Sequence, residues 1–292
     1  MAERTNGQII FSTLIAVVIG AFIGWAGGDG GDQYQGVAVF AICAALAFAI
    51  NWLVFIPSAM AQSDKFYDLT GGITYLTVTA VAVVLSSELD LRGQIAGGMV
   101  VAWAVRLSTF LFRRISKAGH DGRFDVIKTR PARFLLAWTL QGLWVLLTAA
   151  TALAIITGGT RVPLGLIGYV GIAVWAIGWG IEVAADNQKA AFNSDPANKG
   201  KFINVGLWRW SRHPNYFGEI MLWVGMAIIA LPVLQGWQWA TLISPVFVYF
   251  LLTKVSGVPM LEDRADQRWG GQEDYEEYKQ KTPVLFLKPP SN

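Results

Sequence analysis

Hydrophobic residues along this chain gather in eight runs that are separated by polar connections. The runs cover about residues 8–26, 36–61, 69–88, 93–112, 134–157, 162–185, 217–232 and 238–255. Each is close to the roughly 20 residues that a helix needs to cross a bilayer. The pattern predicts an all-α, polytopic transmembrane helix bundle, and we expect residues 1–292 to form one integral membrane domain.

Composition supports this class and narrows the chemistry. The chain is 54% hydrophobic and 15% charged, whereas an average soluble domain has about 25% charged residues. Its single cysteine, Cys43, and its two histidines, His120 and His213, argue against a disulfide framework or a metal site. It has no Walker A sequence and no strand–GxGxxG–helix unit, so a nucleotide would have to bind among the membrane helices. No nucleic-acid partner and no obligate protein partner is expected.

Positive charge is concentrated in the long connections 113–133 and 186–216, whereas the connections after the first and third runs are acidic or mixed. With eight spans, the basic connections and both termini fall on one side. The positive-inside rule makes that side cytoplasmic, in the inner membrane if the protein is bacterial. The charged tail, 257–292, is predicted as a surface helix with a proline-rich end, either a cap over a cytoplasmic cavity or a solvated appendage.

The strongest pattern is Gly-Leu-Trp-Arg-Trp-Ser-Arg-His-Pro-Asn-Tyr-Phe-Gly-Glu at residues 206–219. Its proline can begin a helix, and the free N–H groups of that helix start, next to arginine forks, make a ready anion site. A carboxylate one turn into a membrane helix is costly and is therefore a functional candidate. Simple membrane anchoring would explain the arginines alone. The binding candidates are Arg209, Arg212, His213, Asn215, Tyr216 and Glu219.

Two further groups of polar residues lie at helix ends. Glu182, Asp186 and Lys189 share one face of the sixth helix, where the carboxylates could accept hydrogen bonds from sugar hydroxyls or an amide. The alternative is a local Asp–Lys ion pair. Arg106 lies inside the fourth apolar run, seven residues before Arg113. It either reaches a phosphate in a polar cavity or snorkels to the membrane surface.

Asp68 and Tyr75 lie seven residues apart on one face at the start of the third helix. A polar pair that opens into an apolar cavity could bind and protonate a ketone. The alternative is that Asp68 caps the helix N-terminus.

The string at 206–219 closely resembles the C-terminal signature of the steroid 5α-reductase superfamily. Asp186-x-x-Lys189 precedes it, and Ser256-Gly257-x-Pro259-x-x-Glu262 follows it, in the expected order. A weaker resemblance extends from about residue 64 to 283. The first helix looks like an addition to the seven-helix core of that family.

The resemblance implies NADPH-dependent reduction of the Δ4 double bond of a 3-oxo-Δ4 steroid, or of another lipid-soluble enone, with hydride passing to C5. The family polarises the 3-keto group with a Glu–Tyr pair. Asp68 stands at the position of that Glu, and Trp103 stands at the position of that Tyr. Because tryptophan is a poor acid, Tyr75 or water would supply the proton. The implied cofactor contacts are Arg106, Arg114, Asp186, Arg209, Arg212, His213, Asn215 and Tyr216, supported by Lys254 and Glu262.

Three rival interpretations remain. A membrane methyltransferase of the isoprenylcysteine carboxyl type, which uses S-adenosylmethionine, shares Arg-His-Pro followed by Tyr and Gly. The pattern from Asp186 to Glu262, and arginines suited to phosphates that S-adenosylmethionine lacks, favour the reductase. A sterol Δ14 bond or a fatty enoyl thioester would keep the reaction class and change the substrate. A transporter would need a polar pathway, and the outer halves of these helices have almost no ionisable residues.

Overall fold

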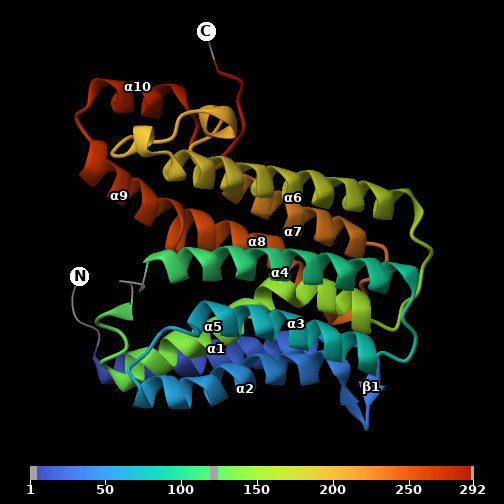
Figure 1. The fold of residues 1–292 in the computed structure, drawn as a ribbon. Coiled ribbons are helices and arrows are strands. Elements are labelled where there is room, and N and C mark those ends of the chain that lie inside the picture. The colour runs from blue at the N-terminus through green and yellow to red at the C-terminus, as the bar shows by residue number, and fades with distance from the viewer. Residues whose placement is uncertain (1–4, 119–123, 291–292) are drawn as a thin grey trace. The chain divides into compact units, whose positions relative to one another are not determined.

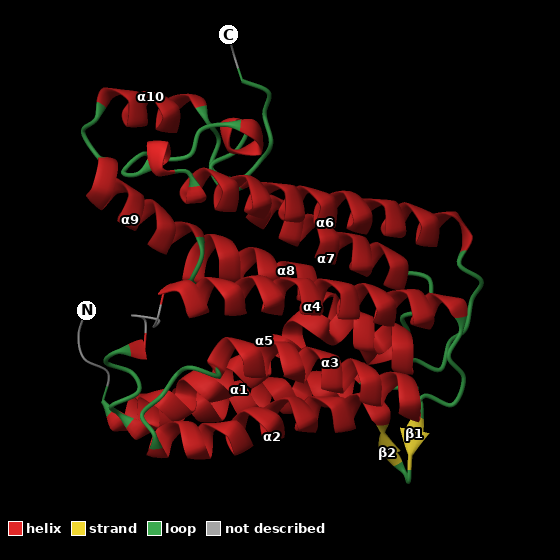
Figure 2. Ribbon diagram, in the orientation of Figure 1, coloured by secondary structure: helices red, strands yellow, loops and turns green. Residues whose placement is uncertain are grey.

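The computed structural model describes residues 5–118 and 124–290, and for residues 112–118 it describes only the backbone. Within these ranges the chain is mostly helical (Figure 2). It forms two compact units. Unit 1 consists of Met1–Gly165 and Ala230–Ser244, and unit 2 consists of Leu166–Ile229 and Pro245–Asn292.

Unit 1 is built around one central helix. Its elements are α1 (Asn6–Gly27), β1 (Gln33–Tyr34), β2 (Val37–Ala38), α2 (Val39–Met60), α3 (Tyr67–Leu85), α4 (Leu91–Ala118), α5 (Pro131–Thr157) and the 3-10 helix η4 (Gly236–Leu242). Helix α5 contacts α1, α2, α3 and α4 (Figure 1). Its apolar segment is 89% buried, against 28–44% for the other candidate spans, so α5 is the core of this unit.

A two-stranded hairpin joins α1 to α2 (Figure 2). Gln33 pairs with Ala38 and Tyr34 pairs with Val37, so the turn consists of Gln35 and Gly36. Both turn residues have positive φ, 51° and 80°, which is the signature of a type I′ hairpin turn. The sequence predicted only an acidic loop here, because a hairpin with two residues per strand has too little alternation to detect.

The connections of unit 1 cluster at two opposite ends. Lys128 Nζ lies 3.1 Å from Asp64 Oδ1, which ties the α4–α5 connection to the α2–α3 connection. At the other end, Asp32 pairs with Arg161 at 3.0 Å and accepts hydrogen bonds from Ser87. The helices of unit 1 therefore run alternately up and down, as the predicted spans require.

Unit 2 begins with two helices that interlock through glycine. Its elements are α6 (Gly165–Ser194), the 3-10 helices η2 (Pro196–Asn198) and η3 (Gly206–Arg209), α7 (Pro214–Ala230), α8 (Ile243–Phe250), the π-helix η5 (Leu251–Val255), α9 (Val258–Trp269) and α10 (Glu273–Lys281). A methyl group built on Gly225 of α7 would lie 2.5 Å from the backbone nitrogen of Trp175 in α6. One built on Gly178 of α6 would lie 2.6 Å from the backbone nitrogen of Leu222 in α7. The two backbones therefore approach closely, as small residues allow in membranes.

Among residues 5–118 and 124–290, seven helical segments are long and apolar enough to cross a membrane. They confirm the predicted helical membrane class, and this is an integral membrane protein. The predicted seventh span corresponds to α7, which has 17 residues and is not one of these seven segments. Seven of the eight predicted spans are therefore found as candidate spans in the described part of the chain. The predicted eighth span continues beyond 255, because the helix runs through a π-turn into α9.

Candidate functional site

The signature at 206–219 folds as a turn that leads directly into α7. Trp208 is buried and its indole N–H donates to the Ala185 carbonyl at 2.9 Å, which fixes the turn against α6. Pro214 occupies the first position of α7, where its missing N–H is no loss. The prediction of a helix start at this proline is confirmed, and Arg212 and His213 directly precede the N-terminus of α7.

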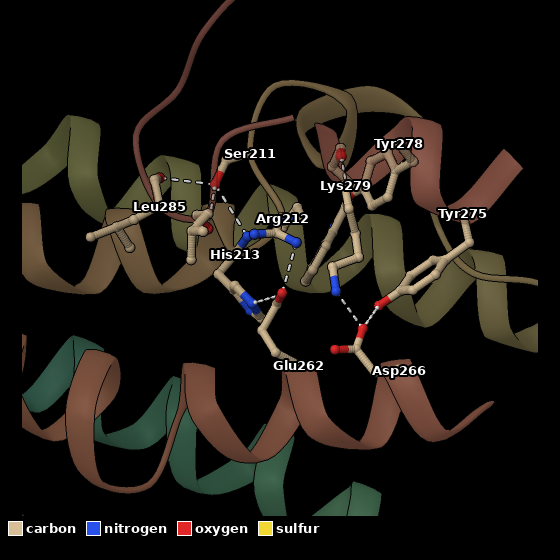
Figure 3. A network of polar contacts seen from close by, with 11 residues as sticks. Ser211, Arg212, His213, Glu262, Asp266, Tyr275, Tyr278, Lys279 and Leu285 are labelled. Carbon is tan, nitrogen blue, oxygen red and sulfur yellow. Dashed lines mark hydrogen bonds and ion pairs between the residues drawn. The ribbon is translucent and has the colours of Figure 1, made fainter. Parts of the chain in front are cut away.

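Arg212 and His213 converge on one carboxylate of α9 (Figure 3). Arg212 Nη1 lies 2.7 Å from Glu262 Oε2, and His213 Nε2 lies 2.8 Å from Glu262 Oε1. Residues 49 positions apart in the chain are thereby joined. The carboxylate is held in a defined orientation because both of its oxygens have partners.

His213 is buried, with 4% of its surface exposed. Burial lowers the pKa of His213, although the hydrogen bond to Glu262 acts in the opposite direction. A neutral imidazole that donates from Nε2 to a carboxylate has an acceptor at Nδ1. Nδ1 is buried and has no hydrogen-bond partner among the described residues, so it can accept a hydrogen bond from a ligand hydroxyl.

A second polar pair links α6 to the start of α7. The Asn215 amide donates to Asp186 Oδ1 at 3.2 Å, and Asp186 is buried. Glu182 is also buried, one turn earlier, where Gly218 lets the backbones of the two helices approach. The Tyr216 ring stacks on His213, with ring centres 5.5 Å apart and planes 10° from parallel. The carboxylates of α6 and the signature are thus parts of one polar assembly in unit 2.

A pocket of about 260 Å³ lies beside the Arg212–His213–Glu262 cluster. It is smaller than the roughly 300–1,000 Å³ of typical small-molecule sites, so it would accommodate part of a dinucleotide. Five basic side chains and one carboxylate line it, together with aromatic rings. The Lys189 ammonium lies over the Trp208 ring, 4.3 Å from its centre. The basic residues are Lys189, Lys201, Arg212, Arg264 and Arg268.

Three of these cations were not predicted as site residues, namely Lys201, Arg264 and Arg268. The signal was present for α9, because positions 261, 264, 265 and 268 line the pocket at helical spacing. We predicted a surface helix in this charged tail but assigned only Glu262 of it to the site. The tail contains two helices, α9 and α10, where one was predicted, and both contribute residues to the pocket.

Seven predicted cofactor residues of unit 2 do not line this pocket, namely Glu182, Asp186, Arg209, Asn215, Tyr216, Glu219 and Lys254. Arg209 is exposed and borders a different hollow with Asp274, Glu277 and Lys281. Lys254 is exposed on the π-turn, and Glu219 lies further along α7.

The remaining candidates belong to unit 1. Asp68 lies in the first turn of α3, where Phe66 is the N-cap, so Asp68 is not the cap. Tyr75 is buried, and its ring meets Trp103 of α4 edge-on, 4.9 Å between centres. Arg106 lies in α4 with its guanidinium 5.5 Å from the centre of the Phe110 ring.

Two local features hold this part of α3 in place. Gly72 lies directly against Ser108 of α4, and Gln141 of α5 donates to the Tyr67 carbonyl at 2.8 Å. The side chain of Arg114, the fifth unit 1 candidate, lies outside the described residues.

A known protein family matches most of this chain. Residues 54–282 match the family described as "Protein of unknown function (DUF1295)". The chain belongs to this family. The family is related to the steroid 5α-reductases, and its match includes Asp68, Asp186, the signature and Glu262. The part before residue 54, with α1 and most of α2, lies outside it.

One curated relative is similar over a shorter segment. It is a Delta(14)-sterol reductase from Ascobolus immersus, 39% identical over 77 residues. The match covers 21% of this chain and only 18% of that protein's length. No solved structure matches significantly.

Proposed function

We propose that this protein is an NADPH-dependent membrane reductase of a carbon–carbon double bond in a sterol-class lipid, with a 3-oxo-Δ4 steroid as the substrate type. The basic, aromatic-lined pocket beside Arg212, His213 and Glu262 is the observation that carries the proposal. Membership of a family related to steroid 5α-reductases, and the segment similar to a sterol reductase, support it.

The residues of the pocket fit a phosphorylated dinucleotide. Cationic side chains match phosphate oxygens, and aromatic faces such as Phe202 and Tyr278 suit an adenine ring. The acceptor at His213 Nδ1 and the buried carboxylate of Asp186 suit ribose hydroxyls or an amide. When bound, NADPH would supply a hydride. The protein residues would bind and orient the cofactor and neutralise its charge.

For the substrate, we propose Asp68 and Tyr75 as the groups that hold and polarise the ketone. A hydrogen bond to the 3-keto oxygen stabilises the negative charge that develops there as hydride adds to C5. Trp103, which contacts the Tyr75 ring, would serve as an apolar wall with one N–H donor. A proton at the α-carbon completes the reduction, and Tyr75 or water would deliver it.

The test is a turnover assay on the purified protein in detergent, with progesterone as the 3-oxo-Δ4 steroid and NADPH absorbance as the readout. Steroid-dependent NADPH oxidation with a 5α-reduced product, abolished in Arg212→Ala, is the expected result. NADPH binding without turnover of several 3-oxo-Δ4 steroids would keep the reductase class and reject this substrate. Failure to bind NADPH would reject the proposal, and S-adenosylmethionine would then be the ligand to test.

A second candidate substrate is a sterol with a Δ14 double bond. The observation that favours it is the segment 39% identical to a Delta(14)-sterol reductase. An isolated alkene has no carbonyl to polarise and must be protonated, so this reaction would need an acid and not merely a hydrogen-bond donor. Parallel assays with a Δ14 sterol and with progesterone separate the two.

A further inference from the structure

The turn that presents Arg212 and His213 is fixed by a segment beyond α10. Residues 283–288 pass beside residues 210–212, and backbone hydrogen bonds join the two segments. The Arg212 N–H donates to the Pro283 carbonyl at 2.9 Å, and the Lys288 N–H donates to the Trp210 carbonyl at 3.0 Å. We call residues 283–288 the strap. It follows the region matched by the family, which ends at 282.

Ser211 lies where the strap and the turn meet (Figure 3). Its side chain is fully buried. Its hydroxyl donates to the Leu285 carbonyl at 2.9 Å, and the same oxygen accepts the His213 N–H at 3.1 Å. One hydroxyl thus links the strap to the backbone of His213, the residue that contacts Glu262.

From this geometry we infer that Ser211 is a positioning residue that acts together with the strap to hold Arg212 and His213 against Glu262. A buried hydroxyl with both a donor and an acceptor partner restricts the turn to one conformation. Without it, the His213 N–H and the Leu285 carbonyl would lose their partner inside the protein, which is costly. This inference rests on the proposed function only in naming NADPH as the ligand, because the contacts of Ser211 themselves lie within the protein.

The first experiment follows the imidazole of His213 directly. The chain has two histidines, so His120→Gln leaves His213 as the single reporter in a ¹⁵N-histidine NMR spectrum. In that background, Ser211→Ala is expected to shift the His213 signal and to weaken NADPH binding by about tenfold. Ser211→Thr, which keeps the hydroxyl, is expected to restore both. Ser194→Ala is the matched control, because it removes a hydroxyl from the same unit at an exposed helix end.

The second experiment tests the strap without changing Ser211. Lys288→Pro removes the N–H that donates to Trp210, whereas Lys288→Ala keeps it. We expect the proline variant alone to shift the His213 signal and to weaken NADPH binding. Ser211→Ala combined with Lys288→Pro is expected to lose less NADPH binding free energy than the two single variants lose together, because both act on one turn.

The outcomes separate this inference from the proposed function. An unchanged His213 signal in both Ser211→Ala and Lys288→Pro would overturn the positioning role, whatever the protein binds. If the two variants shift the His213 signal but the wild-type protein binds no NADPH, the positioning role is retained and the proposed cofactor is rejected. If Ser211→Ala does not fold, the Lys288 pair decides the matter by itself.

Discussion

At the scale of single residues, the site is organised by a carboxylate shared between two basic side chains. Glu262 receives Arg212 on one oxygen and His213 on the other. The arrangement orients the arginine at the edge of the pocket and keeps the histidine in one tautomer.

Arg212 and Arg209 offer a matched comparison within one turn. Arg212 lines the pocket, whereas Arg209 is exposed and lies elsewhere. Arg212→Ala is expected to raise the NADPH dissociation constant roughly 10- to 100-fold, because hydrogen bonds to charged groups contribute about 1.5–3 kcal/mol. Arg209→Ala is expected to change it much less. Titration of each variant with NADPH checks this, and equal losses would show that the pocket is not the cofactor site.

The buried His213 predicts a pH dependence. Because its pKa is lowered in the folded protein, the unfolded chain takes up this proton first as the pH falls through about 6.5. Folding stability from this group is therefore present above that pH and is lost below it. Thermal unfolding midpoints between pH 7.5 and 5.5 should fall more steeply for the wild type than for His213→Gln. Identical slopes would contradict the assignment.

At the scale of elements, α6 and α7 depend on backbone contact at paired glycines. Gly225→Ala would place a methyl group 2.5 Å from the Trp175 nitrogen, and overpacking of this kind costs about 1–3 kcal/mol. The control is Gly180→Ala on α6, where no described atom outside the local helix lies within 4 Å. We expect Gly225→Ala to lower the thermal unfolding midpoint. We expect Gly180→Ala not to lower it, because alanine has a higher helix propensity than glycine. A stable Gly225→Ala protein would show that the helices can separate without cost.

Most of these elements could be predicted from the sequence, because long apolar runs and Pro214 mark helices and a helix start by local rules. The signature was predicted from its own residues and Glu262 by resemblance, and the contact between them could not be derived from the chain alone. The π-turn at 251–255 and the strap were missed, since both depend on contacts between distant residues. The three missed cations show the same limit, because Lys201 lies in the loop before η3 and meets Arg264 and Arg268 of α9 only in the folded chain.

At the scale of the whole molecule, the chain is an integral membrane protein whose connections are sorted by charge. In unit 1 the Lys128–Asp64 end and the Asp32–Arg161 end are opposite. We propose that the former faces the cytoplasm, because the positive-inside rule places basic connections there.

This orientation can be tested by labelling single cysteines. In a Cys43→Ala background, Lys65→Cys and Tyr34→Cys place exposed thiols near the two ends of unit 1. A membrane-impermeant maleimide added to intact cells should label position 34 and leave position 65 unlabelled until the cells are opened. The reverse pattern would invert the topology.

The strap also sets an order of events during synthesis. Residues 283–288 leave the ribosome after every candidate span, including Gly236–Trp269. A nascent chain interrupted after α9 can therefore insert its helices and yet present Arg212 and His213 on a turn that lacks the hydrogen bonds of the strap. We expect such a product to be integrated in the membrane but to hold Arg212 and His213 less firmly than the full-length chain does.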